Sequence, residues 1–270
     1  MRICSIVTTL LCTLIGFAVP AYAGKFIEFE SGWGQSHQAR IIGYLARPPG
    51  NGPFPAVVVL HGCGGFHQDM LAWADRLRRW GYVALAVDSF GSRGIETACG
   101  GFADQPADAF RALAYLTAQP YVRADHVAAL GFSMGGASVL AALERGSISG
   151  LFPDKFSAGV ALYPPCSGST GVMTAPTLVL IGASDDWTPA SACEAMAAGQ
   201  SETGISRSPG DRSLVQLVIY PGAYHGFDLA GLRLSNGVEY MGHRLEYNDA
   251  ATRDSIEKVR VFFRQTLGHE

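Results

Sequence analysis

The feature that most constrains the fold of this chain is a regular alternation of short apolar runs with amphipathic runs. The runs Ala56–Leu60 and Tyr82–Val87 consist of apolar and aromatic residues, which is typical of strands buried on both faces of a sheet. The segment Asp69–Trp80 lies between them, has helical spacing and ends before Gly81. Further strands are expected at Ile41–Ala46, His126–Gly131, Ala158–Tyr163, Pro176–Ile181 and Leu214–Tyr220, and further helices at Ala107–Ala118, Met134–Glu144, from Pro189 onward and at Asp249–Leu267. This pattern predicts an α/β fold with a mostly parallel central sheet, helices on both faces, and catalytic groups at the carboxyl ends of the strands.

The first residues of the chain resemble a secretory leader. Arg2 supplies an early positive charge, Ser5–Val19 is an apolar run, and Ala21-Tyr22-Ala23 is a small-x-small cleavage pattern. The apolar run is short for a membrane span of about 20 residues, so cleavage is favoured over a permanent anchor. We therefore expect a signal peptide at 1–23 and one mature domain at 24–270. The mature protein is expected to be exported, either periplasmic or secreted, without stable membrane association.

The composition excludes several classes of function. Hydrophobic residues make up 48% of the 270 residues and charged residues 16%, which favours one large packed core. The formal net charge is −3, and a chain without a basic excess is not expected to bind nucleic acid. The histidines are scattered, and the sequence contains neither an HExxH motif nor a CxxC pair. We therefore expect no metal and no cofactor. The sequence does not indicate an oligomeric state.

The strongest catalytic motif is the segment Gly131-Phe132-Ser133-Met134-Gly135-Gly136. It matches the pattern G-x-S-x-G and lies between an expected strand and an expected helix, which is the context of a nucleophile elbow. In such a tight turn a Cβ at Gly131 or Gly135 would clash with the neighbouring chain. The turn would expose the Ser133 hydroxyl beyond the end of the sheet. We therefore predict Ser133 as the nucleophile.

A serine needs a base and an orienting carboxylate, and in α/β-hydrolases these follow the serine in the order acid, then histidine. The expected strand ending at Ile181 runs into Gly182-Ala183-Ser184-Asp185-Asp186. An acid just past a strand end is well placed to orient a histidine. Asp185 is the predicted acid, with Asp186 as the alternative.

The predicted base is His225, in the segment Pro221-Gly222-Ala223-Tyr224-His225 directly after the last expected strand. His243 and His269 also follow Ser133 in the chain. His269 lies at the C-terminus, and His243 lies beyond any expected strand end. A serine, an acid and a histidine in this order, each at a strand end, favour the catalytic assignment of His225 over a structural one.

Acyl transfer also requires hydrogen-bond donors for the oxyanion. One donor is expected to be the backbone N–H of Met134, the residue after the nucleophile. The other is expected from the loop His61-Gly62-Cys63-Gly64-Gly65, whose glycines allow the backbone to approach the substrate. We assign this second donor to the N–H of Cys63.

At these motifs the sequence resembles the dienelactone hydrolase family within the α/β-hydrolase superfamily. The resemblance spans the mature chain and implies the α/β-hydrolase fold, with Ser133, Asp185 and His225 as the catalytic triad. The shared segments are HGCGG at 61–65, Asp88-Ser89-Phe90-Gly91-x-Arg93-Gly94, GFSMGG at 131–136, GxxDDWTPA at 182–190 and YPGAYHGFD at 220–228.

The chain departs from the namesake enzymes at two positions. Those enzymes use a cysteine nucleophile and have a glutamate after the first-loop histidine, whereas this chain has Ser133 and Gly62. The departures move the expected activity from opening dienelactone rings towards general hydrolysis of carboxylic esters. The leader is a further departure, because the namesakes are cytoplasmic.

Three residues are candidates for substrate binding. Arg93 follows the strand ending near Asp88, and members of the family have an arginine in this loop. Arg93 either binds a substrate carboxylate or ties its long loop to a nearby acid. Trp187, beside the predicted acid, and Tyr224 either line the pocket or pack into the core.

Four of the six cysteines remain after the leader is removed. An even number in an exported protein favours disulfides, and four cysteines allow three pairings. Cys63 and Cys99 lie on loops expected at the catalytic edge, and Cys166 and Cys193 lie on loops after later strands. We predict the pairs Cys63–Cys99 and Cys166–Cys193.

The expected function is that of a serine hydrolase that cleaves small-molecule carboxylic esters or lactones through an acyl-enzyme. One alternative is a dienelactone hydrolase of the carboxymethylenebutenolidase type. Another is a small peptidase of the same fold, because peptidases share the elbow. A metal-dependent hydrolase lacks support from the motifs, and a non-catalytic binding protein would be expected to lose part of the triad.

Overall fold

The computed structural model describes residues 23–32, 38–99, 104–146, 148–200 and 214–268. Residues 1–22 of the expected signal peptide lie outside the described residues, as does His269. Within the described ranges, no helix has both the length and the hydropathy that crossing a membrane requires.

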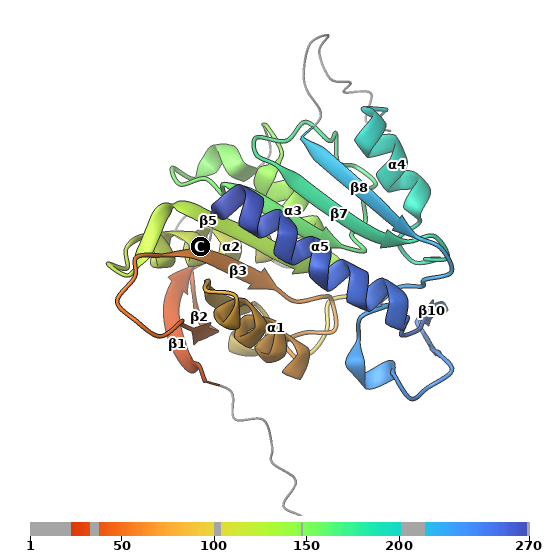
Figure 1. The fold of residues 1–270 in the computed structure, drawn as a ribbon, viewed down its shortest axis with the longest axis horizontal. Helices are drawn as coiled ribbons and strands as arrows, with labels where there is room; N and C mark the ends of the chain where they lie inside the picture. The colour runs from red at the N-terminus through yellow and green to blue at the C-terminus, as the bar shows by residue number, and fades with distance from the viewer. Residues whose placement is uncertain (1–22, 33–37, 100–103, 147, 201–213, 269–270) are drawn as a thin grey trace, which may run out of the picture.

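The core of the molecule is an eight-stranded sheet with the strand order β1-β2-β4-β3-β5-β6-β7-β8 (Figure 1). The six strands from β4 to β8 in this order are parallel, whereas β2 runs antiparallel to β4 and β1 antiparallel to β2. A two-stranded antiparallel hairpin, β9–β10, stands apart from this sheet. The strands are β1 (Lys25–Ser31), β2 (Ala39–Ala46), β3 (Phe54–Leu60), β4 (Val83–Asp88), β5 (Val122–Phe132), β6 (Ala158–Leu162), β7 (Thr177–Gly182), β8 (Val215–Tyr220), β9 (Val238–Tyr240) and β10 (His243–Leu245).

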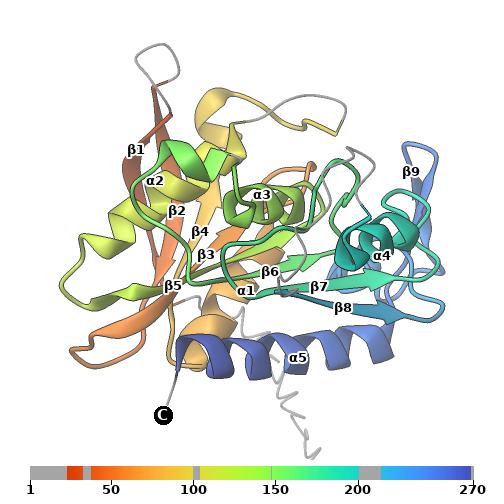
Figure 2. The same cartoon turned by 90° about the horizontal axis from the view of Figure 1, so that it is seen from above.

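Within the described ranges, five α-helices cover the two faces of the sheet. Figure 2 shows α1 and α5 on one face and α2, α3 and α4 on the other. Asn248 caps the N-terminus of the long α5, because its side chain accepts a hydrogen bond from the N–H of Ala251. The helices are α1 (Gln68–Arg79), α2 (Gln105–Thr117), α3 (Met134–Leu143), α4 (Ala190–Ala198) and α5 (Asp249–Leu267).

The α/β fold predicted from the sequence is confirmed, because the apolar runs form the central parallel strands. Every residue of β6 and β7 is buried, and β3 is buried from its second residue onward. Helices on both faces exclude water from these strands, which accounts for their continuous apolar sequence.

Two parts of the fold were not predicted from the sequence. β1 is an edge strand whose side chains are mostly exposed or half-buried, so it lacks the apolar run that marks the central strands. The strands of the β9–β10 hairpin have three residues each, and those of β9 are exposed. Both cases lack the hydrophobic periodicity on which strand prediction depends.

The parallel strands bring four loops together at one edge of the sheet. β3 ends at Leu60 and leads into the HGCGG segment, and β5 ends at Phe132 immediately before Ser133. β7 and β8 end at Gly182 and Tyr220, a few residues before Asp185 and His225. In open α/β sheets the carboxyl edge is where ligands bind. The candidate site is therefore built at this edge.

Candidate active site

Ser133 occupies a strained turn between β5 and α3. Its φ of 51° and ψ of −115° lie outside the conformations that non-glycine residues ordinarily adopt. The backbone N–H of Ser133 donates to the carbonyl of Leu162 on β6 at 2.9 Å, which ties the turn to the neighbouring strand. Strain held in place by surrounding structure is common at functional sites.

Glycine is required on both sides of this serine because the backbones touch there. A Cβ on Gly131 would collide with the carbonyl oxygen of Gly135, and a Cβ on Gly135 would collide with the carbonyl oxygen of Leu60. Neither neighbour is a flexible side-chain end that could move away. The contact with Leu60 also fixes the start of α3 against the end of β3.

We expect Gly135→Ala to lower the free energy of unfolding by about 3 kcal/mol, because the added methyl group overpacks a rigid backbone contact. Denaturant unfolding of the purified variant measures this loss. Gly150→Ala is the matched control, since a Cβ at Gly150 meets no atom within 4 Å and is expected to change stability by less than about 0.5 kcal/mol. Equal stability of the two variants would contradict the packing argument.

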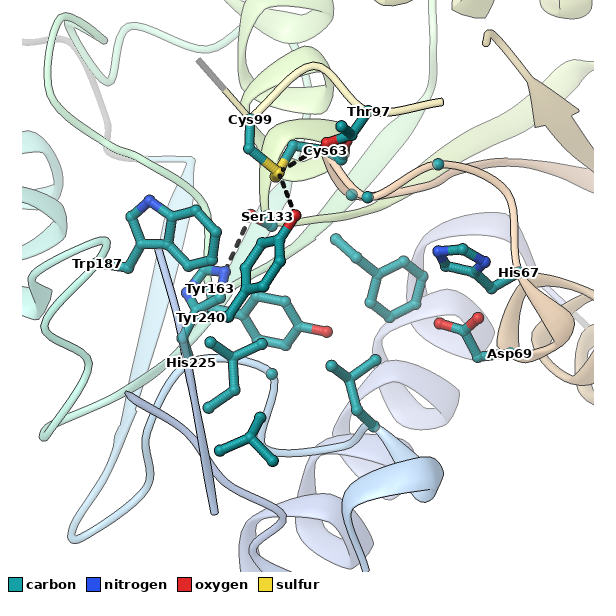
Figure 3. A pocket seen from close by; sticks show the side chains of 18 of the residues that line it. Cys63, His67, Asp69, Thr97, Cys99, Ser133, Tyr163, Trp187, His225 and Tyr240 are labelled. Carbon is teal, nitrogen blue, oxygen red and sulfur yellow. Dashed lines mark hydrogen bonds between the residues drawn. A yellow bond between two sulfur atoms is a disulfide. The ribbon is translucent and has the colours of Figure 1, made fainter. Parts of the chain in front are cut away.

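The structure brings Ser133, His225 and Asp185 into one hydrogen-bonded line (Figure 3). The Nε2 atom of His225 lies 3.0 Å from the Oγ of Ser133. The Nδ1 atom of the same ring lies 2.8 Å from an Oδ atom of Asp185. His225 is 3% exposed and Asp185 is 5% exposed, so water competes little for either contact. This arrangement can move a proton off the serine hydroxyl.

The carboxylate of Asp185 is held by three further hydrogen bonds. The backbone N–H groups of Trp187 and Thr188 donate to one oxygen at 3.0 and 2.8 Å, and the Thr188 hydroxyl lies 2.9 Å from the other oxygen. That hydroxyl also lies 3.1 Å from the carbonyl of Tyr163. Thr188 was not predicted to be a site residue, although its place in the DDWT segment, three residues after the acid, is a usable signal.

Asp186 and His243, the alternatives to Asp185 and His225, lie away from Ser133. Asp186 is exposed and accepts a hydrogen bond from the backbone N–H of Arg244 at 3.2 Å. The Nδ1 atom of His243 lies 3.7 Å from Asp186, and its ring stacks on Trp187 with a centroid distance of 5.0 Å. The geometry therefore favours Asp185 and His225 over these alternatives.

The HGCGG loop passes directly beside the serine. A Cβ placed on Gly62 would lie 3.5 Å from the Cβ of Ser133. Among the described residues, no protein acceptor receives a hydrogen bond from the N–H of Cys63 or of Met134. Both donors predicted for the oxyanion thus remain available to a substrate oxygen.

His61 fixes the path of this loop, a role that was not predicted. Its Nε2 accepts a hydrogen bond from the backbone N–H of Ser89 at 3.2 Å, which leaves Nδ1–H to donate to the carbonyl of Gly62 at 2.7 Å. The Nε2–H₂ group of Gln105 donates to the carbonyl of His61 at 3.0 Å. Burial lowers the pKa of His61, which favours the neutral ring that this pattern of one donor and one acceptor requires.

The structure contains the two disulfides that were predicted, Cys63–Cys99 and Cys166–Cys193. The first borders the pocket beside Ser133 (Figure 3). It joins the HGCGG loop to the segment before α2, and the N–H of Ala98 donates to the carbonyl of Cys63 at 2.9 Å. This disulfide therefore restrains the residue whose N–H is predicted to bind the oxyanion.

Replacing both members of either disulfide by serine is expected to lower stability by about 2–4 kcal/mol. The two closed loops are similar in length, with sequence separations of 36 and 27 residues. Only the Cys63–Cys99 replacement is expected to lower kcat as well, because it frees a loop beside Ser133. Denaturant unfolding and ester turnover of the two double variants make the comparison. Equal kcat in both variants would contradict a role for this disulfide in positioning the loop.

A pocket of about 360 Å³ opens beside the serine. Ser133, His225 and Trp187 line one part of it, so of the two alternatives for Trp187 the structure shows the pocket lining. The remaining wall is largely apolar and includes the side chains of Met70, Phe132, Leu229, Val238 and Leu245. Pockets of this size and character are typical of small-molecule sites.

Of the two alternatives for Arg93, the structure shows the ion pair. Its guanidinium donates to both oxygens of Asp108 at 2.7 and 2.9 Å and to the carbonyl of Ser89 at 2.7 Å. Asp108 is fully buried, and an arginine that compensates a buried carboxylate is not free to bind a substrate. Arg93 does not line the pocket, so its assignment to substrate binding is corrected.

Tyr224 is also absent from the pocket lining. Its ring lies under the guanidinium of Arg244, 5.1 Å from the ring centroid. Tyr224 is therefore directed towards Arg244 and away from the pocket, although it is next to His225 in the sequence. Its assignment to substrate binding is corrected for this reason.

The fold and the geometry of this site define an α/β-hydrolase. The sequence model of the Dienelactone hydrolase family matches residues 41–267. The chain belongs to this family and is a hydrolase of the ester or lactone class.

Similar proteins agree with this placement. A Synechocystis protein named "Putative carboxymethylenebutenolidase" is 25% identical over 84% of this chain and 93% of its own length. A Bradyrhizobium protein named "Probable 2-oxo-3-(5-oxofuran-2-ylidene)propanoate lactonase" is 28% identical over 69% of this chain and 78% of its own. Among solved structures, a dienelactone hydrolase-like promiscuous phosphotriesterase from metagenomic libraries is 24% identical, with a TM-score of 0.66, over 91% of this chain and all of its own.

Proposed function

We propose that this protein is a serine hydrolase that cleaves carboxylic esters or lactones through an acyl-enzyme. The observation that carries the proposal is the buried hydrogen-bonded line from Ser133 through His225 to Asp185, which opens into an apolar pocket. A serine hydroxyl activated by a histidine, with a carboxylate behind that histidine, is the arrangement that acyl transfer uses.

In the proposed mechanism His225 takes the proton of Ser133 through Nε2 as the hydroxyl attacks the substrate carbonyl. Asp185 keeps the other ring nitrogen protonated and stabilises the imidazolium that forms. The proton then passes from His225 to the leaving alcohol, and the acyl group stays on the serine. His225 next takes a proton from a water molecule as that water attacks the acyl-enzyme. When the intermediate collapses, His225 returns this proton to the Ser133 oxygen, and the acid leaves with the enzyme restored. Apart from water, this sequence uses only groups that the protein supplies.

The N–H groups of Met134 and Cys63 are proposed to bind the oxyanion that forms in each attack. Met134 begins α3, so its N–H adds to the partial positive charge at the helix N-terminus. The position of the HGCGG loop beside the Cβ of Ser133 supports the assignment of Cys63. Two backbone donors that already point to one position can stabilise the negative charge of the transition state without a further rearrangement of the protein.

Export of the mature protein is also part of the proposal. The leader pattern within residues 1–23 supports it. The two disulfides give independent support, because disulfides persist in oxidising compartments such as the periplasm and the extracellular space.

The test of the proposal is covalent labelling combined with turnover. The mature protein is incubated with 4-nitrophenyl butyrate, with and without a chelator, and a second sample is treated with a serine-directed phosphonofluoridate. We expect turnover in both buffers and one phosphonyl adduct, located on Ser133 by peptide mass mapping. A labelled residue other than Ser133, or turnover that the chelator abolishes, would overturn the serine mechanism.

A further inference from the structure

The part of the pocket away from Ser133 has a polar end of its own. Figure 3 shows His67 and Asp69 there, across the pocket from Ser133 and His225. Asp69 is partly buried and His67 is exposed. Apolar side chains form much of the wall between the two ends. An acyl group attached to Ser133 can therefore extend along an apolar path towards a carboxylate.

The charge of this pocket is unbalanced. Among its lining residues in the described part of the chain there is no lysine and no arginine. Arg93, in the loop that was expected to supply a cation, is bound to Asp108. Arg76, about two turns along α1 from Asp69, lies over the ring of Trp73 and is absent from the lining. A substrate carboxylate in this pocket would meet no cationic partner among these groups.

Asp69 also fills the position where an anion could otherwise bind. It lies in the first turn of α1, and the backbone N–H groups at such a helix start attract negative charge. Burial is the larger influence on the Asp69 carboxyl and raises its pKa, while the adjacent backbone N–H groups and His67 act in the opposite direction. The protein's own carboxylate therefore already lies at this helix start.

The groups around Asp69 reinforce this negative character. Burial raises the pKa of Asp228 to about 6, and the nearby charge of Asp69 acts in the same direction. The hydroxyl of Tyr163, itself a lining residue, donates to Asp228 at 2.7 Å. His67 and His61 oppose the charge of Asp69, and Arg76 opposes that of Asp228; of these three groups only His67 lines the pocket.

We infer that this pocket selects esters whose acyl chain is neutral or ends in a cation, and rejects esters and lactones that carry a free carboxylate, with Asp69 as the residue that sets this preference. The inference rests on the proposed function, because it names the substrate class of the same site. It follows from like-charge repulsion by Asp69 inside a largely apolar pocket, where a desolvated carboxylate finds no lysine or arginine among the described lining residues to compensate it.

The experiment compares three 4-nitrophenyl esters of similar chain length at about pH 8, well above the ordinary pKa of a carboxyl group. Their acyl groups are hexanoate, adipate with its second carboxylate free, and 6-(trimethylammonio)hexanoate. We expect kcat/KM for adipate to be about tenfold or more below that for hexanoate, and the cationic ester to be hydrolysed at least as well as hexanoate. In the Asp69→Asn variant, the ratio of kcat/KM for the hexanoate ester to kcat/KM for the adipate ester is expected to fall by about fivefold or more.

Asp125→Asn is the matched control, because it removes one negative charge near the start of β5, at the opposite end of that strand from Ser133. It is expected to keep the wild-type ratio. A wild-type enzyme that hydrolyses adipate as well as hexanoate would overturn the inference. An equal ratio in wild type and Asp69→Asn would also overturn it, as would an equal fall in Asp125→Asn.

A binding measurement separates this inference from the proposed function. Ser133→Ala is titrated calorimetrically with hexyltrimethylammonium and with hexanoate. Tighter binding of the cation supports the inference, and equal or tighter binding of the anion overturns it, whether or not the wild-type protein turns over any ester. If the three esters are not hydrolysed at all, the proposed function fails while the charge preference is still decided by this titration.

Discussion

Replacing Ser133 by alanine is expected to lower kcat/KM for 4-nitrophenyl butyrate by about 10⁴-fold or more, because the substitution removes the atom that attacks the carbonyl. The oxyanion donors and the pocket remain, so residual turnover above the rate in water is expected. The substitution removes only the Oγ hydroxyl of Ser133, so the protein is expected to keep its fold. The measurement is initial rate against substrate concentration, with thermal unfolding to confirm that the variant is folded.

Ser167→Ala is the matched control for this variant. Ser167 is exposed on the loop after β6 and does not line the pocket. The kcat/KM of the Ser167→Ala enzyme is therefore expected to stay within about twofold of wild type. Turnover in Ser133→Ala within tenfold of wild type would show that another group performs the chemistry. Such a result would also reassign the hydrogen bond between Ser133 and His225 to a structural role.

The parts of the site that the sequence predicted are those specified by short segments. The elbow is local, because Gly131, Ser133 and Gly135 determine its backbone among themselves and against the adjacent strand. The pairing of Cys63 with Cys99 could be predicted for a related reason, since loops after neighbouring parallel strands meet at one edge of the sheet. Cys193 was expected on a loop but lies in α4, where it still pairs with Cys166. Residue positions that depend on chain direction and sheet topology can therefore be predicted from a single sequence.

The residues that were missed or misassigned depend on contacts between distant segments. The backbone carbonyl of His61 accepts a hydrogen bond from the side chain of Gln105, 44 positions later. Arg93 pairs with Asp108, a buried residue of α2. The sequence contains these residue types but not their partners. An arginine in a functional loop looks the same whether it faces a substrate or a buried carboxylate, and only the packing of α2 distinguishes the two.

Asp69 illustrates the same limit at the pocket. In the sequence it is an acid at the start of a helix, a position explained fully by the helix dipole. Its second property, that it lines the pocket that Ser133 opens into, follows from how α1 packs against the sheet. Substrate preference is therefore less predictable from sequence than the identity of the nucleophile, because the pocket wall is assembled from segments that share no motif.

Asp185→Asn is expected to lower kcat by about 10⁴-fold, while Asp186→Asn keeps it within about threefold of wild type. In the wild type, one oxygen of Asp185 receives the N–H groups of Trp187 and Thr188 and the other faces Nδ1 of His225. An asparagine keeps its oxygen on those backbone donors and turns its NH₂ group towards the ring. Nδ1 must then accept a hydrogen bond, the ring proton moves to Nε2, and Nε2 no longer accepts the proton of Ser133.

The comparison of these neighbouring acids is informative because both substitutions remove one charge at nearly the same place. Asp186 is exposed and faces Arg244 and His243, so its loss changes the local charge without changing the tautomer of His225. A long-range electrostatic role for the acid would give similar losses in both variants, whereas a role in fixing the imidazole gives a loss only at Asp185. Steady-state kinetics of the two variants, with denaturant unfolding to match their stabilities, distinguishes these outcomes. Equal losses would reject Asp185 as the residue that orients the base.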